Sequence, residues 1–96
     1  HTLSLFPCHE VVQEKEKWVR SFYSEEQKMI RITLTAPVIN AAGCIVFLVS
    51  GSDKAAAVQH VLAGEHNSDL YPAQAIQPFK GELYWWLDEA AAKDLS

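Results

Sequence analysis

The stretch from Ser50 to Lys54 has the residue types of an anion-binding turn. Gly51 lets the backbone approach a ligand, and the free N–H groups at the start of a following helix attract negative charge. Lys54 adds a full positive charge at the same point. In a second interpretation, Ser52 or Asp53 only caps the helix and the lysine is solvated. The spacing alone leaves both interpretations open.

Arg31 and His1 are two further candidates. Arg31 begins a strand pattern, and the rigid fork of a guanidinium suits a phosphate; the alternative is a surface ion pair with Glu25 or Glu26. A histidine with an ordinary pKa of about 6.5 can take a proton from water, which typically contributes about 10² to 10⁴ in rate. For His1 the alternative is a solvated chain terminus. Taken one at a time, neither residue fixes a role.

The remaining reactive side chains form no recognisable motif. His1, Cys8 and His9 lie close in sequence, and so do His60 and His66, but neither spacing matches a zinc signature. No G-x-S-x-G turn, which would place a nucleophilic serine, occurs in the chain. We therefore expect no metal site and no serine hydrolase triad.

Composition limits the class of protein. The 96 residues suffice for one domain, and 49% apolar with 21% charged residues is typical of a globular chain. A formal charge of −4 argues against nucleic-acid and membrane-surface partners, which usually require a basic excess. The longest apolar run, Cys44 to Val49, is too short to cross a bilayer. We expect a soluble, cytoplasmic protein with reduced Cys8 and Cys44, a disulfide between them being the alternative.

Apolar periodicity predicts short strands that alternate with helices. The strand patterns lie at residues 18–22, 31–35, 44–49, 75–77 and 83–87. Helix patterns follow at 38–42 after the N-cap Thr35, at 54–63, and from the cap Asp88 through Leu95. The run 44–49 is apolar at every position, which predicts a central parallel strand covered by helices on both faces.

This alternation implies right-handed crossovers in an α/β fold with a mostly parallel sheet. A doubly wound, Rossmann-like sheet with helices on both faces usually has more strands, so we expect this chain to be the C-terminal part of a larger fold. In open α/β sheets ligands bind beyond the carboxyl ends of the strands. The Ser50 to Lys54 turn follows such an end.

Four stretches, in matching order and spacing, resemble the 6-phosphogluconolactonases of the glucosamine-6-phosphate isomerase/6-phosphogluconolactonase family. HTLSLFP is similar to the second part of the family signature G-x-D-G-H-T-x-S-L-F-P. RITLTAPVINAA resembles the arginine strand with its helix, VFLVSGSDKAAAV the phosphate turn, and GELYWWLDEAAA the C-terminal end. Together they cover essentially the whole chain, although the turn alone is shared with the related deaminases.

The resemblance implies hydrolysis of 6-phospho-D-glucono-1,5-lactone, in the pentose phosphate pathway, without a metal or organic cofactor. His1 matches the catalytic histidine of the family, and Arg31 and Lys54 match its phosphate-binding cations. One departure is the segment from Glu25 to Ile30, which stands where family members often carry a lysine and several prolines.

The Gly-x-Asp-Gly that precedes the histidine in the family signature does not occur in this sequence. We therefore expect residues 1–96 to be the C-terminal portion of a single domain, to act with its N-terminal half, and to be inactive alone. The alternatives are a sugar-phosphate isomerase or deaminase of the same fold and a noncatalytic sugar-phosphate-binding fragment.

Overall fold

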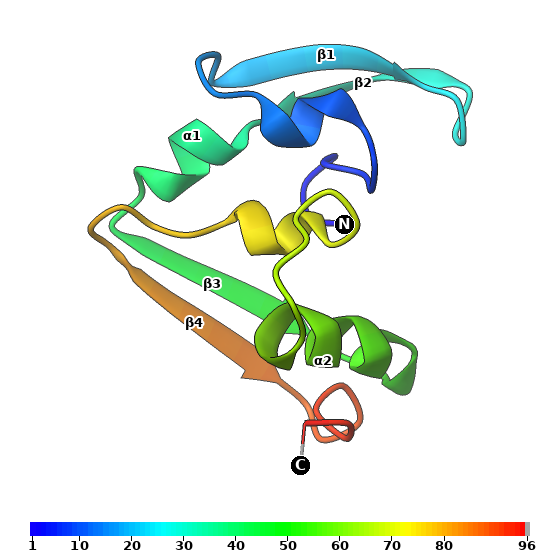
Figure 1. Ribbon diagram of the computed structural model, residues 1–96, viewed down its shortest axis with the longest axis vertical. Coiled ribbons are helices and arrows are strands. Elements are labelled where there is room, and N and C mark those ends of the chain that lie inside the picture. The colour runs from blue at the N-terminus through cyan, green and yellow to red at the C-terminus, as the bar shows by residue number, and fades with distance from the viewer. Residues whose placement is uncertain (96) are drawn as a thin grey trace.

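The computed structural model describes residues 1–95, which contain two separate two-stranded sheets (Figure 1). Strands β1 (Val19–Ser24) and β2 (Met29–Leu34) form an antiparallel hairpin. Strands β3 (Cys44–Val49) and β4 (Glu82–Leu87) pair in parallel. The predicted α/β class, with a helix in the crossover between parallel strands, is confirmed.

Short helices connect the strands. The α-helices are α1 (Ala36–Asn40) and α2 (Ala55–Ala63), and single 3₁₀ turns form η1 (Glu10–Gln13), η2 (Ser52–Lys54) and η3 (Pro72–Ala75). Thr35 is the N-cap of α1 as predicted, but its hydroxyl donates to the Lys17 carbonyl and does not cap the helix. α1 is short. Pro37 lies in its first turn, and the helix ends at Asn40.

The hairpin departs from the predicted mostly parallel arrangement. Its two strands lie within two residues of the predicted ranges, but four residues, 25–28, connect them. A parallel crossover needs a dozen or more residues, so such a short connection allows only antiparallel pairing. Phe22 lies opposite Arg31 in the register, and both side chains belong to the inward face of the hairpin together with the buried Thr33.

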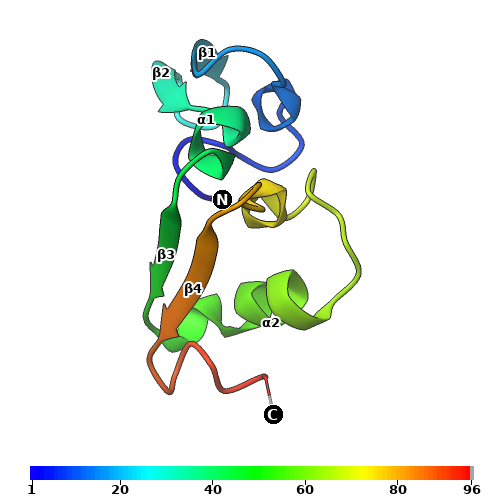
Figure 2. The ribbon, with the colours of Figure 1, turned by 90° about the vertical axis from the view of Figure 1, so that its left-hand side faces the viewer.

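The β3–β4 pair carries its helices on one face (Figure 2). Exposure alternates along both strands, with Phe47 and Trp85 stacked at a centroid distance of 4.1 Å on the covered face. On the opposite face Leu48 is 73% exposed and Trp86 63%. The predicted cover on both faces is thus absent from the part of the chain that the structure describes.

The apolar core lies between the N-terminal segment and the inward face of the hairpin. Its buried members are Leu5, Phe6, Val11, Val12, Phe22, Ala36 and Ile76. Because Leu5 and Phe6 belong to this core, the segment that begins at His1 is held against β1 and β2 by packing. The core therefore fixes where the first residues of the chain lie.

Two predicted elements were wrong. Residues 75–77 are not a strand: Pro72 begins η3, which runs to Ala75, and the backbone then extends to β4. The final helix from Asp88 to Leu95 is a run of turns, with one hydrogen bond of helical spacing from the Ala92 N–H to the Asp88 carbonyl. A helix this short depends on packing, and in this segment only Ala91 is buried.

The start of β4 depends on a close backbone approach at Gly81. A Cβ added there would lie 2.3 Å from the Ala42 carbonyl oxygen and 2.8 Å from the carbonyl of Gly43. We expect Gly81→Ala to destabilise the protein by about 1–3 kcal/mol in urea unfolding, because two backbones must separate. Gly43→Ala is the control, since nothing lies within 4 Å of its added Cβ. Equal effects of the two substitutions would contradict this account.

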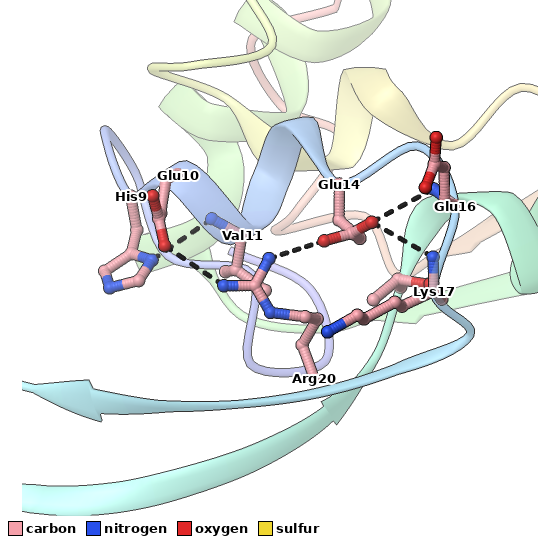
Figure 3. Close-up of polar contacts among 8 residues, drawn as sticks. His9, Glu10, Val11, Glu14, Glu16, Lys17 and Arg20 are labelled. Carbon is pink, nitrogen blue, oxygen red and sulfur yellow. Dashed lines mark hydrogen bonds and ion pairs between the residues drawn. The ribbon is translucent and has the colours of Figure 1, made fainter.

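The Glu14 carboxylate joins η1 to β1 (Figure 3). It accepts hydrogen bonds from the backbone N–H groups of Lys17 and Glu16, both at 3.0 Å, and from Arg20 Nη1 at 2.5 Å. Arg20 also pairs with Glu10 at 3.0 Å. The two backbone donors, followed by the guanidinium, lower the pKa of Glu14 from 4.5 to about 2.

This lowered pKa predicts a pH dependence of stability. A carboxyl group whose pKa is depressed on folding stabilises the protein above its unfolded pKa, and this stabilisation is lost as pH falls through the folded value. We therefore expect Glu14→Gln to lower the melting temperature above pH 4.5 and the difference from wild type to vanish as pH approaches about 2. Glu16→Gln removes the same charge without those hydrogen bonds and serves as control. A pH-independent difference would contradict the prediction.

Candidate functional site

His1 and Lys54 line one cavity of about 430 Å³. The cavity lies between the N-terminal segment, the end of β3, the start of α2 and η3. Apolar and aromatic side chains form most of its remaining wall, among them Phe47, Val58, Val61, Tyr71, Pro72 and Trp85. A pocket with an apolar wall and a few polar groups at one side is the usual form of a small-molecule site.

The turn between β3 and α2 places Lys54 at this cavity. Gly51 adopts a φ of 99°, a conformation that favours glycine, and its N–H donates to both carboxylate oxygens of Asp88 at 3.2 Å. Asp88 thereby connects this turn with the end of β4. Asp88 was predicted as a helix cap, and its Oδ1 does accept from the Ala91 N–H at 2.8 Å, where it closes a turn.

The second interpretation of the Ser50 to Lys54 stretch is right about the lysine, whose side chain is 55% exposed, but within residues 1–95 neither Ser52 nor Asp53 forms a side-chain cap. The N-cap positions are Gly51 for η2 and Lys54 for α2, and neither supplies a side-chain cap. The Asp53 carboxylate lies 4.0 Å from Lys54 Nζ, with both side chains more than half exposed. An exposed pair at this distance holds the lysine only weakly.

Lys54 and His1 come together only in the folded chain. The two residues are 53 positions apart in the sequence, but both line the same cavity. The fold thus brings an imidazole and a cationic side chain to one cavity, which the carboxylate of Asp53 also lines.

Arg31 does not line this cavity. Its Nε and Nη2 donate to the Ser4 hydroxyl at 3.2 and 2.9 Å, and its guanidinium carbon lies 5.8 Å from the centre of the Phe6 ring. The ring of His1 lies 5.1 Å from that of Phe6. Arg31 therefore reaches the neighbourhood of His1 through Phe6. Its predicted alternative, an ion pair with Glu25 or Glu26, is not among the ion pairs of residues 1–95.

Sequence reasoning gave no role to Ser4 or Phe6. Both belong to the HTLSLFP stretch, but Arg31 is 27 residues from Ser4, and no spacing rule connects them. The alternation of the Arg31 strand was the available sign, because it places Arg31 on the same face as the inward-pointing Thr33. Thr33 Oγ1 accepts from the Ser4 backbone N–H at 3.1 Å.

Two kinds of feature are absent from the described residues: a metal-binding cluster and a membrane-spanning helix. Within residues 1–95 no three His, Cys, Asp or Glu side chains group closely enough to hold a metal ion. In the same part of the chain, no helix is long and apolar enough to span a membrane.

Comparison with known families adds to this geometry. The model of the glucosamine-6-phosphate isomerases/6-phosphogluconolactonase family matches residues 1–85. The chain belongs to this family. Its sequence is 44% identical, over its whole length, to the 6-phosphogluconolactonase of Homo sapiens and 41% identical to that of a Nostoc species.

Solved structures share the fold of this chain. The crystal structure of the devB protein aligns with 98% of this chain at a TM-score of 0.84 and 30% identity. The 6-phosphogluconolactonase of Leishmania guyanensis aligns with 97% of it at a TM-score of 0.79 and 26% identity. The alignments cover 39% and 36% of those two chains. Likewise, this chain spans 37% of the length of the human relative.

Proposed function

We propose that this chain is part of an enzyme that hydrolyses 6-phospho-D-glucono-1,5-lactone to 6-phospho-D-gluconate. Two observations support the proposal: the family to which the chain belongs, and the cavity shared by His1 and Lys54. Because the chain spans 37% of the human relative, we further propose that it is the C-terminal portion of one domain. The rest of that domain would supply the other walls of the site.

In this proposal His1 is the general base. Its imidazole takes a proton from a water molecule, whose oxygen attacks the lactone carbonyl carbon. The bond between that carbon and the ring oxygen then breaks, and the ring oxygen takes the proton from the imidazolium. The reaction needs no redox partner, and water is the only co-reactant.

Arg31 and Lys54 would hold the phosphate in this proposal. The phosphate is the far end of the substrate, so fixing it orients the ester group toward the histidine and makes the attack effectively unimolecular. The chain has a net charge of −4, but two cations and a helix start can still attract an anion locally.

The test is an assay of the full-length protein with freshly prepared phosphogluconolactone, in which acid release measures hydrolysis. Rapid hydrolysis above the spontaneous rate supports the proposal. Release of ammonia from glucosamine 6-phosphate, without lactone hydrolysis, would assign the protein to the isomerase and deaminase branch of the family. Binding of either compound without turnover would indicate a noncatalytic sugar-phosphate protein.

A further inference from the structure

We infer that Ser4 is a positioning residue, which fixes the guanidinium of Arg31 in the orientation that receives the substrate phosphate. The inference rests on the proposed phosphate role of Arg31 and adds a residue to which no role was assigned. Its basis is a hydrogen-bonded cluster in which one buried hydroxyl accepts from two nitrogens of the same guanidinium.

The Ser4 hydroxyl is well placed for this task. Ser4 is 6% exposed, and its Oγ accepts from Nε and Nη2 of Arg31 at 3.2 and 2.9 Å. Ser4 is itself fixed, because its backbone N–H donates to the buried Thr33 Oγ1 at 3.1 Å. The partner of Arg31 is therefore part of the packed core and not a mobile surface group.

The contacts leave part of the guanidinium available. A guanidinium carries five N–H donors, of which the Ser4 hydroxyl receives two. Nη1 has only the Met29 thioether at 3.9 Å, a weak acceptor. The guanidinium also packs over the Phe6 ring, with 5.8 Å between the guanidinium carbon and the ring centre. Ser4 thus holds the edge of the guanidinium formed by Nε and Nη2, and Nη1 remains available to an anion.

Such fixing matters because a free arginine side chain loses rotamer freedom when it binds a ligand. A side chain already held in its binding orientation binds more tightly without forming any new contact to the ligand. Removing the Ser4 hydroxyl should therefore weaken phosphate binding although Ser4 itself does not touch the phosphate. The catalytic step at the lactone carbonyl should proceed as before.

The experiment compares variants of the full-length protein by steady-state kinetics. We expect Ser4→Ala to raise KM for 6-phosphogluconolactone about tenfold with kcat nearly unchanged, as the loss of a hydrogen bond to a charged group implies. Ser4→Thr keeps the hydroxyl and should restore most of the affinity. With unphosphorylated glucono-1,5-lactone, Ser4→Ala should match wild type.

A matched control separates positioning from general stability. Ser24→Ala removes a buried hydroxyl from strand β1 of the hairpin; this hydroxyl accepts from the Gln27 N–H and does not contact Arg31. It should lower the melting temperature comparably and leave KM unchanged. If Ser4→Ala does not fold, Ser4→Cys retains the size of the side chain with a weakly accepting thiol and should show the same rise in KM.

The double variant Ser4→Ala/Arg31→Ala distinguishes the possible failures. If Ser4 acts through Arg31, the double variant has the same KM as Arg31→Ala alone. A rise in KM for Arg31→Ala but not for Ser4→Ala overturns this inference and leaves the proposed function intact. Unchanged kinetics for Arg31→Ala would instead overturn the phosphate role itself. Independent, additive effects of the two substitutions would also overturn the inference.

Discussion

Replacing His1 by alanine in the full-length protein is expected to lower kcat by about 10² to 10⁴ while KM changes little, because the substitution removes a general base and leaves the phosphate site in place. The His1 ring packs against Phe6, which belongs to the core, so the loss of the imidazole also removes one aromatic contact. The measurement is the initial rate of lactone hydrolysis over a range of substrate concentrations.

His66→Ala is the control for this substitution. It removes an exposed imidazole outside the cavity that His1 and Lys54 share, and it should leave kcat and KM at their wild-type values. Equal losses of kcat in the two variants would indicate a general effect on folding. A raised KM with unchanged kcat for His1→Ala would make His1 a binding residue and would remove it from the catalytic step.

Local patterns predicted most of the strands and the turn between β3 and α2. Cys44–Val49 was placed to the residue, because six consecutive apolar residues between Gly43 and Ser50 have few other structures open to them. The turn after it was predicted from Gly51 and from the helix pattern at 54–63, and the observed helix α2 begins one residue later, at Ala55. In these stretches the local preference and the tertiary structure agree.

The predictions failed where distant parts of the chain decide the structure. Residues 75–77 were predicted as a strand between turn signals, but Asn40 binds this segment from 35 residues away. Its Nδ2 donates to the Ala75 carbonyl at 3.0 Å, and its Oδ1 accepts from the Gln77 N–H at 2.8 Å. These contacts replace sheet pairing. The alanine-rich C-terminal segment has high helix propensity but too little packing to complete a helix.

The candidate site shows the same division. The sequence offered His1, Arg31 and Lys54 as candidate site residues. The fold brings two of them, His1 and Lys54, to one cavity. It could not predict that Arg31 binds Ser4, because this contact depends on how the N-terminal segment packs under the hairpin. Spacing rules describe neighbours on one element, whereas this contact joins two elements.

Lys54→Ala is expected to raise KM for 6-phosphogluconolactone about 10- to 100-fold and to change kcat little, because a charge-assisted contact to the phosphate is lost. Hydrolysis of unphosphorylated glucono-1,5-lactone should be unaffected. The KM of the wild-type protein should also rise with salt concentration, and less steeply in the variant, since salt screens the attraction between lysine and phosphate. Kinetics with both lactones at low and high salt measure all three effects.

Lys80→Ala is the matched control, because it removes the same charge from an exposed position outside the cavity. Its KM should equal that of wild type, so a rise shared by both variants would reflect only the net charge of the protein. Lys54 makes one weak, exposed ion pair with Asp53, and its replacement should hardly change the melting temperature. A variant that folds normally and keeps its KM for the phosphorylated lactone would therefore show that Lys54 only begins the helix.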